Sequence, residues 1–251
     1  MLLDGVEAAG RSLRLFARVL AELRHAPGKF GEIVRQIYFC GVASLPVVSV
    51  TAIFTGMVVA GQSGTELAHR GLPTNILGAL VGGTISREMG PVLTAVVVAG
   101  LVGGGFASIL GTMSVNEEID ALRVMSIPPE RYLVMPRLVA MAIAMPLLVV
   151  YADLLGILGG AIVAKYQIGV TFHTYFDMMK YAGEVKDILF GVFKGLVFGV
   201  LLTIISCDQG LAARGGAEGV GRATMRAVVY SFLMILVANY LLFSLIYRPM
   251  M

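Results

Sequence analysis

The stretch from Val115 to Arg137 reads VNEEIDALRVMSIPPERYLVMPR and carries seven charged side chains. The segments on either side are almost free of charge, since residues 89–116 contain no charged side chain and residues 138–164 contain only Asp153. A charged side chain at the centre of a bilayer costs about 2.5 kcal/mol or more. The charged stretch is therefore expected in water or at the interface, between two segments that each cross a membrane.

The composition indicates an integral membrane protein. Hydrophobic residues make up 57% of the 251 residues and charged residues 14%, whereas soluble domains contain about 25% charged residues. The net charge is only +3, and no basic tract suggests a nucleic acid as partner. The cysteines, Cys40 and Cys207, lie in apolar surroundings without a CxxC motif, so we interpret them as packed thiols.

The pattern of hydrophobic segments predicts an all-α membrane fold with five transmembrane helices. Their expected ranges are 37–61, 75–113, 138–164, 188–207 and 227–247. The second range is longer than a bilayer requires, so this helix either tilts and protrudes or breaks near Gly90 and Pro91 or near the glycines at 103–105. We expect the chain, 1–251, to form a single membrane domain.

Residues 1–36 are not expected to be a cleavable signal, because basic residues interrupt the segment too often. We expect them to form an amphipathic helix that lies on the membrane. The apolar face comprises Leu13, Phe16, Leu20 and Leu23, and the opposite face comprises Arg11, Arg14 and Arg18. This pattern is typical of an interfacial helix. The alternative is an amphipathic helix docked on protein.

The distribution of Lys and Arg predicts a cytoplasmic N-terminus. With the N-terminus inside, the inner segments hold 12 such residues and the outer segments hold five, Arg248 included. Positive charge is retained on the cytoplasmic side, so the charged stretch is expected there and the C-terminus outside. Five spans are few for enclosing a substrate path, and we therefore expect a homodimer with the path at or near the subunit interface.

Residues 114–129 are predicted to form a short coupling helix. Ser114 and Glu117 fit a capping box, and Pro128 with Pro129 would stop the helix. Its apolar side would carry Ile119, Leu122 and Met125, with charged residues on the other sides. Such a rod can seat in a groove of a soluble partner and pass movement to the attached spans. The alternative is a helix that merely floats at the interface.

Arg87 and Glu88 stand inside a segment otherwise suited to lipid, where ionisable side chains usually mark a functional site. Adjacent residues on a helix point about 100° apart, so their partners must come from other helices, a second subunit or a bound headgroup. The planar guanidinium suits phosphate, and we predict that both residues lie near the mouth of a lipid cavity, with Arg87 assisting the headgroup. The alternative is a structural network near the outer interface. Asp153 and Lys194 are expected to be interhelical hydrogen-bond partners.

Three runs of sequence carry a family resemblance. They are REMGPVLTAVVVAG at 87–100, LGTMSVNEEIDALRVMSIPPERYLVMPRLVA at 110–140 and PLLVVYADLLGILGG at 146–160. In content and order they resemble the permease subunit of MCE-type lipid-transport ABC systems, the MlaE/YrbE family. The resemblance implies a homodimeric phospholipid permease of the bacterial inner membrane, with a cytoplasmic N-terminus and a periplasmic C-terminus.

The same resemblance implies partners for this chain. They are a separate ABC ATPase inside, an MCE protein that binds substrate outside and, in many systems, a small STAS-domain protein. The coupling helix would supply the ATPase contact, through Glu117, Glu118, Asp120, Leu122, Arg123 and Met125. Two positions depart from the family pattern, since Leu101 and Ile109 stand where many relatives have Arg and Glu. Replacement of both is consistent with an abandoned ion pair, because loss of one alone would strand a buried charge.

The motifs that are absent narrow the function further. No GxxxxGK[ST] motif occurs, so ATP is expected on a partner chain and no cofactor on this one. The three histidines are isolated and no HExxH is present, so we expect neither a metal site nor catalytic residues. The alternatives are an ion-coupled secondary transporter, for which inverted repeats are lacking, and a membrane-embedded lipid-modifying enzyme.

Overall fold

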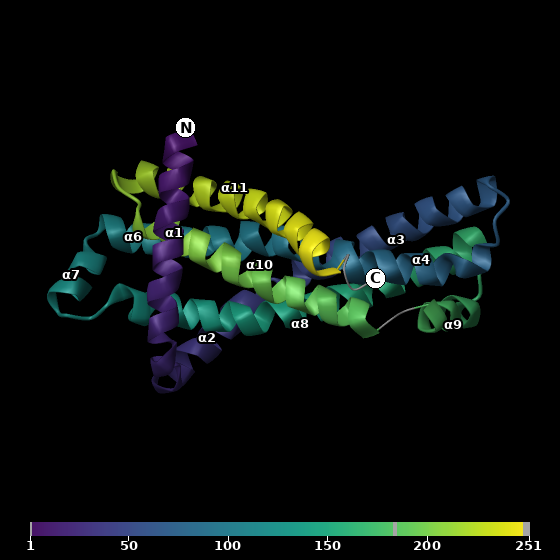
Figure 1. Cartoon of the computed structure of the whole chain (residues 1–251), viewed down its shortest axis with the longest axis horizontal. Coiled ribbons are helices and arrows are strands. Elements are labelled where there is room, and N and C mark those ends of the chain that lie inside the picture. Colours follow the sequence, from purple (N-terminus) through teal and green to yellow (C-terminus); the bar gives the residue numbers. More distant parts are fainter. Residues whose placement is uncertain (1, 183–184, 248–251) are drawn as a thin grey trace. The chain divides into compact units, whose positions relative to one another are not determined.

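The computed structural model describes residues 2–182 and 185–247, and within them it is helical almost throughout and has no strand (Figure 1). Five helical segments among these residues are long and apolar enough to cross a membrane. They are Gly10–His69, Thr74–Val115, Glu130–Ile168, Lys186–Leu211 and Gly216–Leu245. The predicted all-α class and the five membrane-crossing segments are confirmed. Arg248, which was counted among the outer charges, lies outside the described residues.

The described chain folds into two compact units. The first contains residues 2–44, 96–145 and 196–247, and the second contains residues 45–95, 146–182 and 185–195. Helices α5 (Gly90–Val98), α8 (Met135–Val163) and α10 (Val185–Leu211) each contribute residues to both units. The chain therefore passes between the units within three helices and once at the turn between residues 42 and 45.

The first unit has a core of large apolar side chains where several helices meet. Its other elements are α1 (Leu2–Glu22), η1 (Leu23–Lys29), α2 (Phe30–Val42), η4 (Ala99–Gly103), α6 (Gly104–Val115), α7 (Glu118–Val124), η5 (Glu130–Val134), α11 (Gly216–Leu242) and η7 (Phe243–Tyr247). Phe106, Leu110 and Leu202 are fully buried in this core. Helix α6 packs along α11, whose buried stripe is built largely from small residues such as Ala223 and Ala227. Small residues let helix backbones approach closely.

Helix α1 runs crosswise to α11 in Figure 1 and is docked on the first unit. Leu15 and Val19 are buried, while Leu13 is 70% exposed. Arg18 pairs with Glu130 at 3.1 Å between Nη1 and Oε1. The alternative of a helix docked on protein therefore holds for the face that bears Leu15 and Val19. The contact with a membrane surface through the exposed apolar face stays a prediction.

The span expected as one helix over 37–61 is interrupted. Helix α2 ends at Val42, a turn of two residues follows, and α3 (Leu45–His69) begins after it. Pro46 lacks the N–H that would bond the carbonyl of Val42, which weakens the helix there. Ser44 Oγ donates to the carbonyl of Cys40 at 2.7 Å and stabilises the turn. The segment expected as the first span therefore contains a break between α2 and α3.

The second unit is packed through close backbone contacts. Besides α3, its elements are η2 (Thr74–Ile76), α4 (Leu77–Thr84), η3 (Ile85–Met89), η6 (Ala164–Ile168) and α9 (Phe172–Ala182). A Cβ atom on Gly56 would collide with the carbonyl of Gly156, and one on Gly78 would collide with the carbonyl of Tyr175. Tyr175 is fully buried, and this burial raises the pKa of its hydroxyl above the usual value. Helix α9 thereby packs tightly on α4.

The long second span stays helical from Thr74 to Val115, but it is not a regular α-helix. It contains two π-helical turns, η3 at Ile85–Met89 and η4 at Ala99–Gly103. These turns lie at the two places where the sequence predicted a break. Single π-turns inside α-helices are frequent at functional sites, and η3 contains both charged residues of this span.

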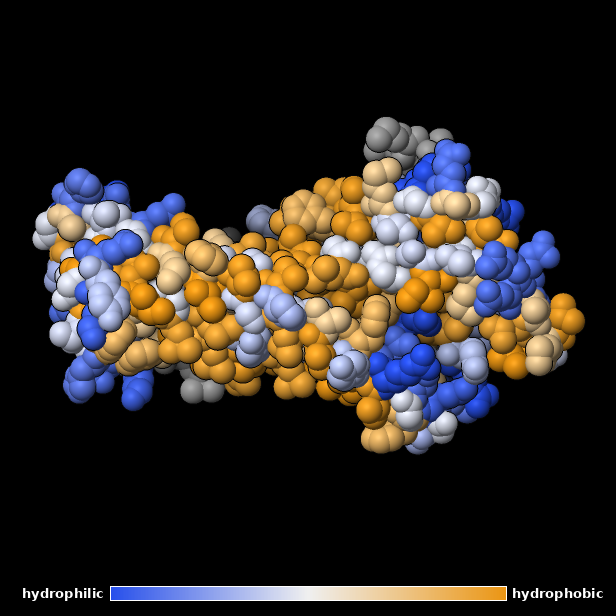
Figure 2. All heavy atoms as spheres, turned by 180° about the vertical axis from the view of Figure 1, so that it is seen from behind, coloured by the Kyte–Doolittle hydropathy of each residue, from blue (hydrophilic) through white to orange (hydrophobic). Residues whose placement is uncertain are grey.

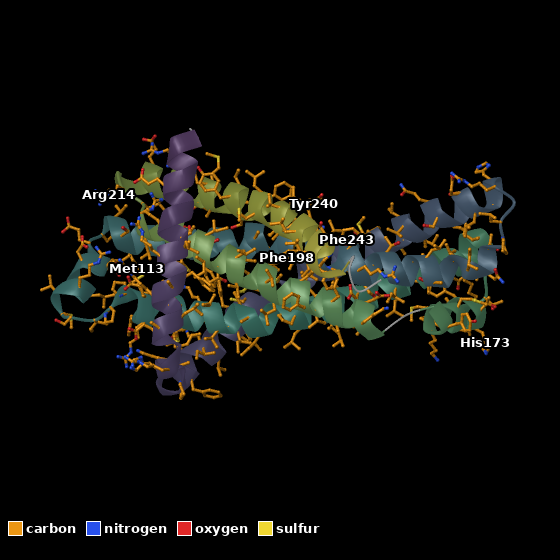
Figure 3. All side chains as sticks on the ribbon, viewed as in Figure 1. Met113, His173, Phe198, Arg214, Tyr240 and Phe243 are labelled. Carbon is orange, nitrogen blue, oxygen red and sulfur yellow. The ribbon has the colours of Figure 1, made fainter. Side chains whose placement is uncertain are left out.

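The surface is largely hydrophobic, as expected for helices in contact with lipid. Figure 2 shows hydrophobic side chains over much of the visible face, with the hydrophilic ones gathered in separate patches. Figure 3 contrasts Phe198, which is fully buried, with Tyr240 on α11, which is 69% exposed. His173 on α9 is also exposed and pairs with Asp177 at 2.7 Å.

Candidate functional site: a charged cluster and a short exposed helix

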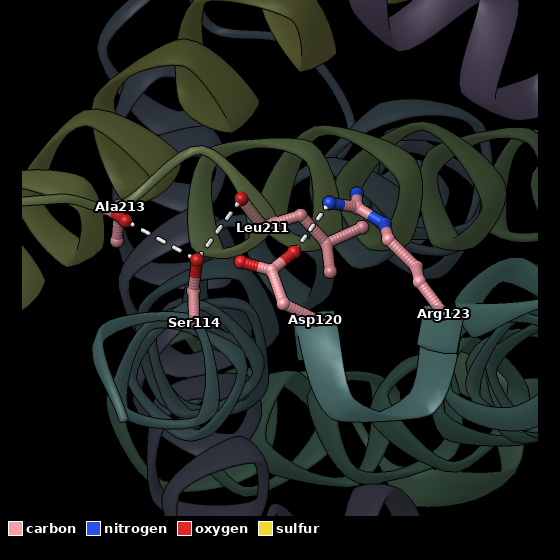
Figure 4. Close-up of polar contacts among 5 residues, drawn as sticks. All are labelled: Ser114, Asp120, Arg123, Leu211 and Ala213. Atoms are coloured by element: carbon pink, nitrogen blue, oxygen red, sulfur yellow. Dashed lines mark hydrogen bonds and ion pairs between the residues drawn. The ribbon is translucent and has the colours of Figure 1, made fainter. Parts of the chain in front are cut away.

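A short helix lies where the coupling helix was expected, but it is shorter than 114–129. Helix α6 continues to Val115, and α7 comprises only Glu118–Val124. The predicted capping box is wrong, because Glu117 is the residue before α7 and makes no capping hydrogen bond with its side chain. Ser114 instead faces the end of α10, with Oγ 3.2 Å from the carbonyl oxygens of both Leu211 and Ala213 (Figure 4).

Helix α7 ends through backbone hydrogen bonds before the two prolines are reached. The N–H of Ser126 donates to Arg123 O at 2.9 Å, and the N–H of Ile127 donates to Leu122 O at 2.9 Å. This is a Schellman motif, in which the residue after the cap adopts a left-handed conformation. Ser126 occupies that position with φ 58°, where glycine is usual.

The residues predicted to contact an ATPase lie mostly on the outside of this helix. Glu117, Glu118, Asp120, Arg123 and Met125 are exposed, and Leu122 is half-buried. Arg123 Nη1 pairs with Asp120 Oδ1 at 2.8 Å (Figure 4). Val124, which the sequence argument did not select, is 85% exposed, whereas Ile119 is buried. Helix α7 is therefore anchored to the protein by the buried Ile119, and it presents an apolar tip with charged residues beside it.

The pair Arg87 and Glu88 belongs to a cluster of charged side chains in the second unit that also includes Asp187 and Lys194. Arg87 Nη2 lies 2.7 Å from Asp187 Oδ2, and Lys194 Nζ lies 2.7 Å from Glu88 Oε1. The side chains of Arg87 and Glu88 are each 35% exposed, whereas those of Asp187 and Lys194 are 4% and 0% exposed. Of the three sources of partners left open by the sequence, another helix supplies these two, since Asp187 and Lys194 are both on α10.

Backbone geometry explains why Lys194 reaches this place. Pro91 has no N–H, so the carbonyl of Arg87 lacks its regular donor four residues later. Lys194 Nζ donates to that carbonyl at 2.9 Å. Gly191 lies between Asp187 and Lys194 on α10 and carries no side chain. Ser86 therefore approaches so closely that a Cβ on Gly191 would collide with the Ser86 carbonyl.

Asp153 behaves differently from Lys194. Both of its carboxyl oxygens are buried and have no hydrogen-bond partner among the described residues. The carboxyl lies against the backbone of Gly90, where any Cβ would collide with Oδ1. The expectation that Asp153 forms an interhelical hydrogen bond is therefore wrong, while the same expectation for Lys194 is confirmed.

The two positions that depart from the family pattern are both on the surface. Leu101 is 45% exposed and Ile109 is 43% exposed. Leu101 belongs to η4 and Ile109 to α6, so both lie on the long second span. Apolar side chains at exposed positions of a membrane span are compatible with lipid, and no buried charge is left behind by the replacement.

Sequence reasoning missed Asp187 as a member of the cluster, because it was assigned to a polar stretch that precedes the fourth span. A signal was nevertheless available. Asp187, Gly191 and Lys194 are spaced by four and three residues, which places them on one face of a helix. An acid and a base flanking a glycine on such a face would have nominated a partner for Arg87 and Glu88.

These features define a multi-pass helical membrane protein with an ionic cluster within its spans and a short exposed helix between two of them. The chain belongs to the MlaE permease family, because the family described as Permease MlaE matches residues 33–245. The resemblance seen in the sequence is thereby confirmed.

Relatives from distant organisms carry similar descriptions. A probable ABC transporter permease protein of Rickettsia felis is 40% identical over 237 residues, covering 94% of this chain and 91% of that protein. Another, of Synechocystis, is 37% identical over 215 residues, covering 86% and 81%. The chloroplastic protein TRIGALACTOSYLDIACYLGLYCEROL 1 of Arabidopsis thaliana is 36% identical over 228 residues, covering 90% and 65%. The chain is accordingly a membrane permease subunit of the ABC-transporter type.

Proposed function

We propose that this chain is the membrane subunit of an ATP-driven phospholipid transporter. It works as a homodimer in the bacterial inner membrane, with the N-terminus in the cytoplasm and the C-terminus in the periplasm. A separate ATPase binds inside, an MCE protein binds outside, and a STAS-domain protein is a further partner. The observation that supports a lipid substrate is the arrangement of Arg87 and Glu88. Their side chains are partly exposed, while their partners are buried.

This arrangement suits a phospholipid headgroup. Asp187 and Lys194 are fixed in the protein, and they hold Arg87 and Glu88 in place without covering them. The guanidinium of Arg87 offers a planar set of donors that matches phosphate oxygens. The two printed contacts each pair an acid with a base, and such paired charges can receive a zwitterionic or singly anionic headgroup without a large excess of charge.

Helix α7 supports the second part of the proposal, the ATPase contact. Its exposed residues Val124 and Met125 form an apolar tip, and the helix also bears the exposed charged residues Glu118, Asp120 and Arg123. An apolar centre with a charged margin is the usual composition of a protein–protein contact. Because this chain lacks a phosphate-binding loop, nucleotide hydrolysis belongs to the partner.

The test is phospholipid transfer by the complex of this chain with its co-purified partners. The complex is reconstituted in vesicles of phosphatidylethanolamine and phosphatidylglycerol that contain fluorescent phosphatidylethanolamine. The wild type should transfer lipid only when ATP is present. Arg87→Ala removes a charge-assisted contact to the headgroup and should lower transfer roughly tenfold or more.

Three further variants keep the result interpretable. Arg87→Lys keeps a positive charge opposite the buried Asp187 but lacks the planar fork, so it should fold and still transfer poorly. Glu88→Ala tests the other exposed member of the cluster. Arg70→Ala removes an exposed arginine paired with Glu66 and should leave transfer unchanged. Normal transfer by the Arg87 and Glu88 variants, or lipid turnover without nucleotide, would contradict the proposal.

A further inference from the structure

Helices α6 and α10 form a parallel, closely packed pair in the first unit. A Cβ on Gly103, directly before α6, would lie 2.8 Å from Ser206 Oγ, and a Cβ on Gly210 would lie 2.9 Å from Ala107 O. From the first contact to the second, the residue number rises by four on each helix, so the two helices run in the same direction. The pair is thus held at van der Waals distance by small residues, which favour close helix packing in membranes.

A polar contact, which we call the tie, joins α6 and α10 at their C-terminal ends. Ser114, in the last turn of α6, places its hydroxyl 3.2 Å from Leu211 O and 3.2 Å from Ala213 O (Figure 4). The last carbonyls of a helix have no partner inside that helix, so Leu211 O at the end of α10 needs a donor from elsewhere. A serine hydroxyl has one hydrogen and donates to one of these carbonyls at a time, or is shared between them.

The position of Ser114 makes this tie mechanically relevant. Only Val115, Asn116 and Glu117 separate Ser114 from the first residue of α7. Asn116 N–H donates to Thr112 O at 3.0 Å and Glu117 N–H donates to Ser114 O at 3.3 Å, so the connection remains hydrogen-bonded up to α7. Movement of α7 therefore acts on the residue that holds the end of α10.

Helix α10 also carries half of the charged cluster. It begins in the second unit, where it bears Asp187 and Lys194, and it ends in the first unit at Leu211. A continuous hydrogen-bonded helix moves largely as one body. The residues that pair with Arg87 and Glu88 thus belong to the same continuous helix as Leu211.

We propose that Ser114 is a positioning residue that joins α7 to α10, so that movement of the ATPase-bound helix is passed to the charged cluster. This inference rests on the proposed function, because it concerns how nucleotide hydrolysis reaches the lipid site. It assigns α10, rather than α6 alone, as the element that connects α7 to the charged cluster. The hydroxyl of Ser114 is the part that can be removed without changing the packing.

The experiment compares ATP hydrolysis with lipid transfer in the reconstituted complex. Ser114→Ala should lower the amount of phosphatidylethanolamine transferred per ATP hydrolysed roughly fivefold, the effect of losing one hydrogen bond at the coupled step. Hydrolysis itself should fall much less. Ser114→Thr keeps the hydroxyl and should restore the ratio. Thr112→Val is the matched control, because the Thr112 hydroxyl bonds only Ser108 O of its own helix.

A second readout tests the tie without lipid. Hydrogen exchange at the backbone amides of 205–211 should become faster in Ser114→Ala and stay unchanged in Thr112→Val, provided that Ser114 holds the end of α10. An unchanged transfer-to-hydrolysis ratio in Ser114→Ala, or an equal decrease in the Thr112→Val control, would overturn the inference. Failure of the proposed function is distinguishable, since the wild-type complex would then show no ATP-dependent transfer at all.

Discussion

Lys194 Nζ lies 2.7 Å from Glu88 Oε1, and the side chain of Lys194 has no exposed surface. The two residues come from different helices, η3 and α10, and the contact holds one helix to the other within the second unit. A buried ammonium is tolerated only when it is paired, because its transfer out of water is costly. The pair is therefore expected to be needed for folding as well as for function.

Glu88→Ala should destabilise the protein by about 3 kcal/mol or more, since it leaves Lys194 buried without its carboxylate partner. The double variant Glu88→Leu with Lys194→Met replaces both charges by apolar side chains and should recover most of this loss. Thermal unfolding of the detergent-solubilised protein measures both effects.

The exposed pair of Glu66 and Arg70 provides the control for this prediction. It links Glu66 in the last turn of α3 to Arg70 directly after the helix, and both side chains are well exposed. Glu66→Ala should therefore change stability by less than about 1 kcal/mol. A double variant no more stable than Glu88→Ala would show that the pair has a role beyond neutralising a buried charge.

The number and positions of the spans were predictable because they depend on hydropathy summed over many residues. The two irregular turns of the second span were also indicated, since Pro91 and the glycines near Gly103 weaken a helix locally. The interruption near Ser44 was missed, although Pro46 gave the same kind of signal. The signal of Pro46 was outweighed by the apolar composition of the residues around it, which indicated a continuous membrane span.

The charged cluster was only half predictable. Arg87 and Glu88 stood out because their neighbours are apolar, but their partners depend on which face of α10 meets η3. That choice is made by Gly191, whose missing side chain admits the backbone of Ser86. Pairwise packing of this kind requires three-dimensional information. The failed capping box has a similar cause, because α6 continues through Ser114 and the Ser114 hydroxyl donates at the end of α10.

Substitution of Gly56 by alanine should destabilise the second unit. An added Cβ would collide with the backbone carbonyl of Gly156, which cannot rotate away as a side chain can. Overpacking of this kind costs about 1–3 kcal/mol. Gly41→Ala, on α2, is the control, because no atom lies within 4 Å of a Cβ at that position. Equal unfolding temperatures for the two variants would argue against close packing at Gly56.

Position 126 should accept glycine more readily than a β-branched residue. Its φ of 58° is left-handed, a conformation that costs residues with a Cβ about 1–2 kcal/mol. Ser126→Gly should preserve or strengthen the end of α7, and Ser126→Val should weaken it. Hydrogen exchange at the Ile127 amide, which bonds Leu122 O, reports on this end directly. Equal protection in the two variants would contradict the motif.

The apolar tip of α7 should control binding of the ATPase. Val124 is 85% exposed, so Val124→Asp removes no packing within this chain, yet it would place an unpaired charge at the centre of the proposed contact. We expect the amount of co-purified ATPase to fall about tenfold or more, with unfolding temperature unchanged. Tyr181→Asp, at a residue that is 90% exposed on α9, should have no effect.

Crosslinking tests the same contact without a change of charge. Photoreactive residues at Leu122 and Arg123 should capture the ATPase, because these positions flank the tip. A photoreactive residue at Ile119, which is buried, should crosslink within this chain instead. Capture from Tyr181 but not from Leu122 would move the ATPase contact to α9 and reverse the predicted orientation. Because the two sites lie on different elements, one set of crosslinks decides between them.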